Sequence, residues 1–498
     1  MTRRPPALCH GQPPLTARTE PWMEDLLADP EACRALIDEY GSPVNVHDFA
    51  PLARHCRELV EAAAECGVPL RVFVARKANK TLGLVDAATS AGHGIDVASY
   101  HELRQCLERG VSPQNLIVTA AVKSLALLTL AVSAGVAVSV DNQDELEDLL
   151  QVASGSEPGA NPVEIALRLS PTDPDLPTSR FGLPAEQWLG LMSAATQRAN
   201  ARGGSEVLVS GLHFHLNGYS APERVRMLVH ACKAADALRA IGHPVAFIDM
   251  GGGVPISYLD DEEPWRAFWR ALDADTERAM TWKGDRLGLR DPHLDRPSES
   301  LYPFWQPLSR GPWLSSILRA EVPESSGNRS TSVAQMLIDR GLELRCEPGR
   351  AVLDGCGLTL AAVAFRKHDR DGNGLVGLHM NRTQLRSTSA DVLLDPRWVR
   401  RSGTPVGEPQ TAFLVGAYCV EDEAILRRRL TFPTGVDRQD IAAFINTAGY
   451  LMHIVESASH QLPLARNVVR CGDTFHPDAM DAARPEDAGQ AAASRAVR

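Results

Sequence analysis

Short apolar runs alternate with helical stretches from about residue 68 to residue 255. The runs are rich in β-branched residues, and each is followed by a stretch with helical periodicity that often ends near a glycine. Such runs are typical of strands buried on both faces of a parallel sheet, and so many units in succession favour a closed (β/α)₈ barrel over a doubly wound sheet. The predicted strands read RVFVA, GIDVAS, NLIVTA, VAVSV, EIALRLS, VLVSGLHFHL and PVAFIDMGGG.

The pattern changes beyond about residue 350. The runs VLDGCGLTLAAVAF, GLVGLHM and TAFLVGAYCV read as strands without helices between them. We therefore predict an α/β protein with a barrel over residues 45–345 and a second, mainly β domain over 21–44 and 346–471. Residues 1–20 and 472–498 lack apolar periodicity, and we expect both to be disordered tails.

Residues 256–340 interrupt the barrel pattern. They contain five of the eight tryptophans and the helical stretch PWRAFWRALDADTERAM. A lid over the barrel mouth, an oligomer contact and structural padding are all compatible with this composition.

Composition narrows the class of protein. Of 498 residues, 44% are hydrophobic and 23% charged, which is ordinary for a folded protein. The formal net charge is -11 and no long run of Lys or Arg occurs, so nucleic acid is not an expected partner. No segment reaches the roughly 18 apolar residues of a membrane span, and we expect a cytoplasmic protein without membrane contact. The ten cysteines form no C-x-x-C pair and have no histidine at metal-ligand spacing, so neither a disulfide framework nor a metal site is predicted.

Polar residues gather where the predicted strands end. In a barrel the carboxyl ends of the strands form the active-site face. A lysine there points into the site, although a lone lysine is more often a surface group. A glycine run lets backbone N–H groups approach a phosphate, although a tight turn explains it equally well. The residues at these ends are Lys77, Asp96, Arg168, His215, Gly251, Gly252 and Gly253.

These motifs form an ordered series. ARKAN, GIDVASYHEL, VSVDNQDEL, ALRLSP, SRFGL, GLHFHLNG, IDMGGG, CEPGR, GAYCVED and NTAGY follow one another between residues 45 and 455. In this order and at these separations the set resembles the ornithine and diaminopimelate decarboxylases of the fold-type III, alanine-racemase-like enzymes. The resemblance implies a pyridoxal 5'-phosphate (PLP) enzyme that decarboxylates an amino acid.

The resemblance assigns catalytic roles to three residues. Lys77 matches the lysine whose amine condenses with the cofactor aldehyde. Glu347 matches the acid that keeps the pyridine nitrogen protonated; the related racemases have an arginine there, so Glu347 favours decarboxylation. Cys419 matches the cysteine that a neighbouring subunit supplies to protonate the α-carbon, which implies a homodimer with shared sites.

The resemblance also assigns cofactor contacts. His215 matches the histidine that stacks on the ring, and Arg350 and Tyr450 match phosphate contacts beside the three glycines. Asp96, Glu102 and Arg168 match polar residues around the cofactor and its lysine. A buried ion-pair network explains these last three nearly as well.

Two departures affect the substrate half and the phosphate half of the site. The family has Gly-Ser where this chain has Asn217-Gly218, so Ser220 or backbone amides would replace the serine hydroxyl. Val420 replaces the acid that holds the far end of the substrate, which favours a modified or larger amino acid. A PLP-dependent racemase or epimerase and a non-catalytic PLP-binding regulatory homologue are the alternative functions.

Overall fold

Eight parallel strands close into a barrel in the computed structural model, which describes residues 8–154, 162–202, 207–294, 296–323, 330–387 and 390–481. The strands pair in chain order, and the last pairs with the first. The predicted (β/α)₈ barrel is therefore confirmed. Its strands are β3 (Leu70–Ala75), β4 (Gly94–Val97), β5 (Leu116–Val118), β6 (Ala137–Val140), β7 (Val163–Arg168), β8 (Val207–His213), β9 (Phe247–Asp249) and β12 (Glu343–Cys346).

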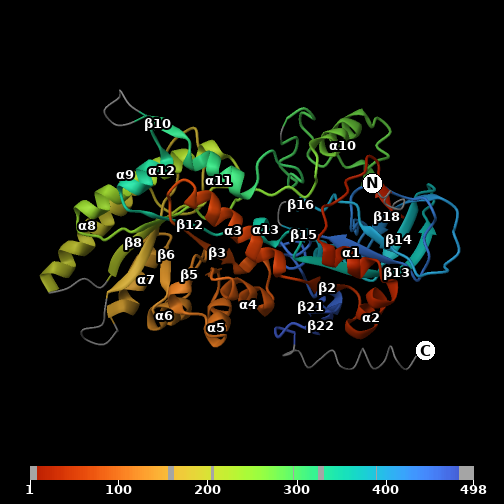
Figure 1. The fold of residues 1–498 in the computed structure, drawn as a ribbon, viewed down its shortest axis with the longest axis horizontal. Helices are drawn as coiled ribbons and strands as arrows, with labels where there is room; N and C mark the ends of the chain where they lie inside the picture. Colours follow the sequence, from red (N-terminus) through yellow and green to blue (C-terminus); the bar gives the residue numbers. More distant parts are fainter. Residues whose placement is uncertain are drawn as a thin grey trace.

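Helices surround the barrel (Figure 1). Several begin where a serine caps the first turn: Ser99, Ser124 and Ser220 each accept a hydrogen bond from a backbone N–H three residues later. These helices are α3 (Ala50–Ala64), α4 (Leu82–Ser90), α5 (Tyr100–Glu108), α6 (Leu125–Ala134), α7 (Gln143–Ser154), α8 (Ala185–Arg202), α9 (Ala221–Ala240), α11 (Arg310–Leu318) and α12 (Val333–Asp339), with the 3₁₀ turns η1 (Arg76–Ala78) and η2 (Pro113–Asn115).

A ten-stranded, largely antiparallel sheet forms the second part, as the sequence predicted. Its long strand β13 (Gly357–His368) pairs with β14 at one end and with β2 and β20 at the other. The strand β2 comes from the chain before the barrel, so both chain segments outside the barrel build this sheet. The other strands are β1 (His10–Gly11), β2 (Val44–His47), β14 (Gly374–Leu378), β17 (Arg397–Val399), β18 (Gln410–Val415), β19 (Leu430–Phe432), β20 (Ile441–Ile445), β21 (Arg466–Cys471) and β22 (Thr474–Pro477).

Short elements complete the described chain. They are the helices α1 (Pro21–Leu27), α2 (Pro30–Tyr40), α10 (Glu262–Ala274) and α13 (Arg350–Leu353), the 3₁₀ turns η3 (Trp282–Gly284), η4 (Arg382–Leu385) and η5 (Ser459–Gln461), and the strand pairs β10 (Glu321–Pro323) with β11 (Ser330–Ser332) and β15 (Arg386–Ser387) with β16 (Ala390–Asp391).

The described parts of both expected tails are ordered, contrary to the prediction. Strand β1 pairs with β19, Leu15 is fully buried, and Asp395 accepts hydrogen bonds from the N–H groups of Gly11 and Leu15. At the other end β22 pairs with β21. These segments are ordered although they have few apolar residues, because backbone hydrogen bonds to neighbouring strands hold them in place. Residues 1–7 and 482–498 lie outside the described residues.

The segment 256–340 has two parts. In Figure 1 α10 lies above the β part, whereas α11 and α12 lie in the helical wall of the barrel between β9 and β12. After α10 the chain contacts the loop between β18 and β19: Trp282 donates to Asp422 at 3.0 Å, and Arg427 pairs with Asp285 at 2.6 Å. The inserted part therefore braces the loop that carries Cys419, and the later part is the last crossover of the barrel.

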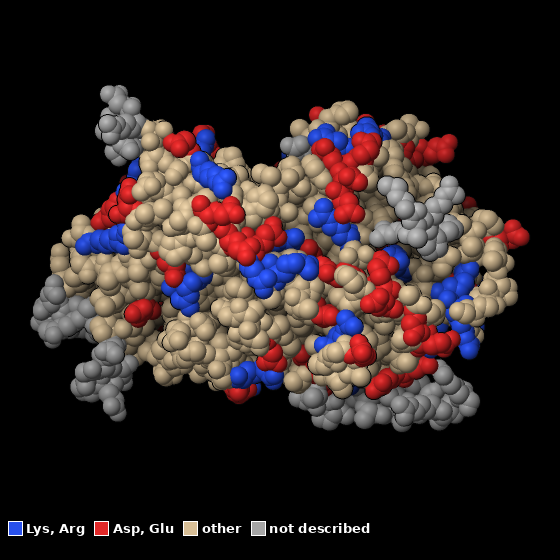
Figure 2. All heavy atoms as spheres, in the orientation of Figure 1, with Lys and Arg blue, Asp and Glu red and all other residues tan. Residues whose placement is uncertain are grey.

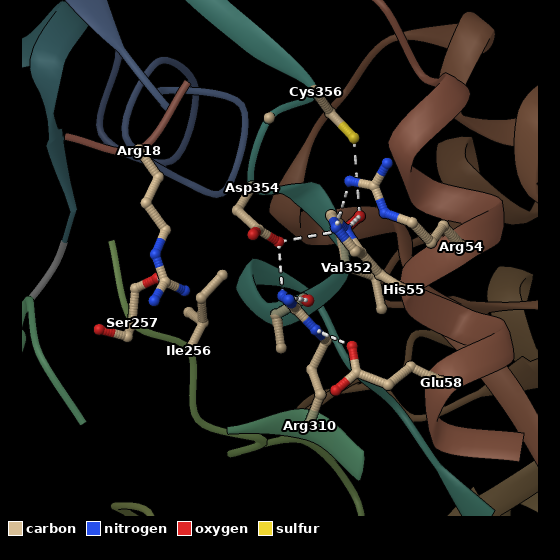
Figure 3. Close-up of polar contacts among 12 residues, drawn as sticks. Arg18, Arg54, His55, Glu58, Ile256, Ser257, Arg310, Val352, Asp354 and Cys356 are labelled. Carbon is tan, nitrogen blue, oxygen red and sulfur yellow. Dashed lines mark hydrogen bonds and ion pairs between the residues drawn. The ribbon is translucent and has the colours of Figure 1, made fainter. Parts of the chain in front are cut away.

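Asp354 links the barrel to the β part (Figure 3). Its carboxylate lies 3.2 Å from His55 Nδ1 in α3 and accepts from Arg310 at 2.9 Å, and Arg310 also pairs with Glu58 at 2.7 Å. Burial raises the pKa of Asp354 to about 6 although Arg310 opposes the shift. Burial, with help from Arg310, lowers the pKa of His55 to about 3, so this histidine is neutral near pH 7.

Acidic and basic side chains intermingle on the face of the molecule shown in Figure 2. No continuous basic surface is visible on that face, in keeping with the net charge of -11. Among the described residues, no helix is both long and apolar enough to cross a bilayer.

Candidate active site

Lys77 lies at the mouth of the barrel, in the 3₁₀ turn that directly follows β3. Its Nζ donates a hydrogen bond to Asp96 Oδ2 at 2.6 Å and lies 4.0 Å from Glu347 Oε2. The Lys77 side chain is 39% exposed, whereas those of Asp96 and Glu347 are 0% and 3% exposed. The amine is thus accessible to a ligand while its two acidic neighbours are shielded from solvent.

The charges around Lys77 set its protonation. Burial alone would lower the pKa of Lys77, but Asp96 and Glu347 outweigh it and raise that pKa above its usual value. Burial and the neighbouring Asp96 and Asp249 raise the pKa of Glu347 well above its usual range. The amine is therefore charged in the free protein, and Glu347 favours its protonated form.

Three buried groups from different strands meet opposite Lys77. The ligand atoms of His213, Asp249 and Glu347, at the ends of β8, β9 and β12, lie within 4.8 Å of one another. Glu347 Oε1, His213 Nε2 and Asp249 Oδ2 have no hydrogen-bond partner among the described residues. Burial raises the pKa of Asp249 to about 6. Unsatisfied buried polar atoms in one place indicate a bound group.

The same three groups have the donor set of a metal site. The sequence predicted no metal site from spacing, and spacing could not reveal this grouping because the three residues lie far apart along the chain.

Arg168 fixes the tautomer of His213. Its Nε donates to His213 Nδ1 at 3.2 Å, and its other nitrogens donate to Asp141 at 2.9 Å and to the Thr119 carbonyl at 2.6 Å. Burial and the Arg168 charge lower the pKa of His213 well below its usual value, so the ring is neutral. Because Nδ1 accepts, the ring proton lies on Nε2, which faces Glu347 Oε1 at 3.5 Å.

The glycine run makes a tight turn against β8. Gly251 and Gly253 have φ values of 67° and 74°, and a Cβ on Gly251 would lie 2.7 Å from the Phe214 carbonyl oxygen. A Cβ on Gly252 would lie 3.1 Å from the Glu347 carbonyl oxygen. His215 lies beside this turn and packs edge-on against Phe181. Only glycine fits a turn this close to the strands.

Arg350 and Tyr450 form another wall of the site. The Arg350 guanidinium packs over the rings of Tyr302 and Tyr450, at 4.3 Å and 5.5 Å from their centroids. Its Nη1 has no hydrogen-bond partner among the described residues. Tyr450 N–H donates to the Ala78 carbonyl next to Lys77 at 2.7 Å. This cation is therefore available to an anionic ligand near the lysine.

Other predicted residues have structural contacts. Glu102 accepts from the Ala98 N–H at 2.7 Å beside the first turn of α5, and the Ser220 hydroxyl caps α9. Cys419 is exposed in the loop between β18 and β19. Lys77, Asp96 and Glu347 are called the Lys77 group. Among the described residues, no contact joins Cys419 to the Lys77 group of its own chain.

A wide cleft of about 1070 Å³ lies elsewhere, at the junction that Asp354 spans. Three of the four arginines that line it, Arg18, Arg54 and Arg310, each pair with a carboxylate. Charges that mostly neutralise one another give little reason to bind a charged ligand. The chemistry therefore belongs to the Lys77 group, which lines no part of this cleft.

Comparison with known proteins identifies the group that such a site holds. Residues 51–284 match the family model described as pyridoxal-dependent decarboxylase, pyridoxal binding domain. The uncharacterized protein y4yA of Sinorhizobium fredii is 32% identical over 85% of this chain and 87% of its own length. The chain belongs to the pyridoxal-dependent decarboxylases.

More distant members share the fold. Diaminopimelate decarboxylase of Vibrio cholerae is 25% identical over 80% of each chain. The structure of diaminopimelate decarboxylase from Helicobacter pylori complexed with L-lysine has a TM-score of 0.63 and 17% identity, and the match covers 90% of this chain and 97% of that one.

The residues of this decarboxylase fit its cofactor, pyridoxal 5'-phosphate. An aldehyde needs an accessible amine, which Lys77 offers. A protonated ring nitrogen needs a shielded acid, and the buried carboxyl of Glu347 has an oxygen without a partner. A phosphate needs backbone donors and an unpaired cation, which the glycine turn and Arg350 supply.

The sequence missed several residues of this site. Asp249 comes two residues before the glycines, at the end of a predicted strand, and His213 comes two residues before His215. Position at a strand end could have identified both. Thr119 and Asp141, which contact Asp96 and Arg168, follow strands in the same way.

Proposed function

We propose that this enzyme removes the α-carboxylate of an amino acid with Lys77, Glu347 and a Cys419 from a second subunit as its catalytic residues. Bound PLP withdraws electrons from the α-carbon as carbon dioxide leaves. The observation that carries the proposal is the exposed amine of Lys77 beside the shielded carboxyl groups of Asp96 and Glu347.

The neighbours of Lys77 set its position and its charge before the cofactor binds. Asp96 holds the amine at 2.6 Å, with its other oxygen fixed by the Thr119 hydroxyl. That contact orients Nζ towards the site, and the Asp96 carboxylate stabilises the positive charge that the amine carries before it reacts. Asp96 is therefore a positioning residue that also delays loss of the lysine proton.

Glu347 supplies the acid for the ring nitrogen. Its raised pKa means that the carboxyl holds a proton readily, and the His213 Nε2–H faces its Oε1. Asp249, with a pKa of about 6, is the next acid in the same group. This arrangement supports a protonated nitrogen and hence decarboxylation over racemisation.

Cys419 is the proposed acid for the α-carbon in a homodimer. Its thiol is exposed, and its loop is held by contacts from Trp282 and Arg427. An exposed thiol on a braced loop can project into a partner's site. An ordinary thiol can act as a general acid near neutral pH.

The substrate proposed is a modified or larger amino acid. The related proteins named above act on, or are seen with, diamino acids. Here Val420 is 45% exposed where the family places an acid, while Asp422 is engaged by Trp282 and Arg427. A substrate with a distal amine would therefore lose its usual partner.

Release of carbon dioxide from a panel of amino acids tests the proposal. The panel includes diaminopimelate, ornithine, lysine and amino acids with bulkier or modified side chains, and recovered substrate is checked for inverted stereochemistry. We expect carbon dioxide from wild type, none from Lys77→Ala, and wild-type rates from Lys233→Ala, which changes an exposed lysine of α9. Inversion without carbon dioxide release would overturn the proposal in favour of a racemase.

A further inference from the structure

Arg224 is a buried cation without a carboxylate partner. It lies in the first turn of α9, and its side chain is fully buried. Among the described residues no ion pair includes Arg224. Its guanidinium donates instead to the backbone carbonyls of Leu216 at 3.2 Å and Gly218 at 2.7 Å. The protein therefore leaves a full positive charge unneutralised in its interior.

This placement is unfavourable in the free protein for two reasons. Carbonyl groups replace only part of the hydration that a guanidinium loses on burial, and burial lowers the pKa of Arg224 to about 10. The positive end of the α9 helix dipole also disfavours a cation in the first turn. An anion bound nearby would offset both effects.

The guanidinium lies between two turns of the site. One turn contains Gly218, and the other contains Gly253, whose carbonyl is 3.5 Å from Arg224 Nη2. A Cβ on Gly253 would approach that nitrogen to 2.2 Å, so glycine is required for the arginine to reach the turn.

The backbone donors of these turns face away from Arg224. In a trans peptide the C=O and the following N–H point in opposite directions, so the N–H groups of Tyr219 and Val254 are directed away from the guanidinium. Neither N–H has an acceptor among the described residues. The turns thus present free donors on one side, with a positive charge behind them.

We propose that Arg224 is the buried counter-charge for the phosphate of the cofactor and acts through the turns at Gly218 and Gly253 without touching the phosphate. Arg350 acts with it. Arg350 packs on the ring of Tyr302, and Tyr302 in turn contacts Tyr219 edge-on, with ring centroids 5.5 Å apart. Arg224 is thus a positioning residue, and it compensates for the serine that Asn217-Gly218 replaces. The inference rests on the cofactor being PLP.

Binding of PLP and of pyridoxal, which lacks the phosphate, tests this role in the cofactor-free protein. We expect Arg224→Gln to lose about 10- to 100-fold in PLP affinity, with pyridoxal affinity unchanged. This is the range for two opposite charges roughly 6–12 Å apart at an effective dielectric of about 20. The matched control is Arg226→Gln, an exposed arginine two positions along α9 that pairs with Asp173 and Asp175. It should bind both ligands as wild type does.

Other outcomes would overturn the inference. Equal losses for PLP and pyridoxal would mean that Arg224 only supports the fold, and an unchanged PLP affinity would mean that the phosphate does not sense its charge. If Arg224→Gln does not fold, Arg224→Lys decides, since it keeps the charge without the fork of donors. That variant should keep most of the preference for PLP over pyridoxal, and loss of the preference would contradict the proposal. Wild type that binds both ligands equally would refute the phosphate site itself.

Discussion

Asp96→Asn should make capture of the cofactor faster. Lys77 can attack an aldehyde only as the free amine, and Asp96 holds it in the charged form through a 2.6 Å hydrogen bond. A hydrogen bond to a charged group contributes about 1.5–3 kcal/mol, which corresponds to about one to two pH units. Because 39% of the Lys77 side chain is exposed, solvent screening places the expected shift near the lower end, at about one unit.

The assay follows visible absorbance as the cofactor-free protein captures PLP at a series of pH values. The profile of Asp96→Asn should move to lower pH by about one unit, so that capture at a fixed pH is about tenfold faster. Asp86→Asn, which changes an exposed carboxylate paired with Arg109, is the matched control and should leave the profile in place. An Asp96→Asn profile that stays in place, or that moves to higher pH, would refute the reasoning.

Glu347→Gln should keep the cofactor but lower turnover by about 10²- to 10⁴-fold, because an amide cannot keep the ring nitrogen protonated. Steady-state rates check this. An unchanged rate would mean that Asp249 or another acid serves instead. Cys419→Ala should retain the absorbance of the bound cofactor and lower or divert product formation, as product analysis would reveal; wild-type product at wild-type rate would remove Cys419 from the mechanism. Asp354 has a pKa of about 6 when folded and about 4 when unfolded, so the folded protein binds its proton more tightly and loses stability as pH rises through that window. In denaturant titrations, wild type should therefore lose about 3 kcal/mol of its free energy of unfolding between pH 4 and pH 7 relative to Asp354→Asn, which has no carboxyl at this position. Parallel plots of unfolding free energy against pH for the two proteins would contradict this.

The barrel was predictable because its strands are buried on both faces. Runs such as RVFVA and EIALRLS are apolar along their middles, and they became β3 and β7. The ordered ends escaped prediction because Gly11 and Leu15 are held by backbone hydrogen bonds to Asp395, which composition does not report. The brace from Trp282 to Asp422 joins residues 140 positions apart, and no local pattern encodes such a contact.

Part of the site was predictable because its residues belong to motifs at the ends of the predicted strands. Lys77, Asp96 and Glu347 each belong to a recognisable motif at a strand end, and the fold brings them together. His213 and Asp249 have the same placement but were passed over in favour of their neighbours His215 and the glycines. Arg224 lies in a helix between Glu223 and Val225 with nothing in its local sequence to mark it, and its significance depends on burial without a counter-charge, which only three-dimensional structure can reveal.

The central claim is that Lys77 carries the cofactor. Reduction of the loaded enzyme with borohydride, followed by mass spectrometry of its peptides, reports which of the six lysines becomes modified. We predict the adduct on the peptide that contains Lys77 and none in Lys77→Ala. An adduct on Lys80, Lys123 or any other lysine in the wild-type enzyme would contradict the account.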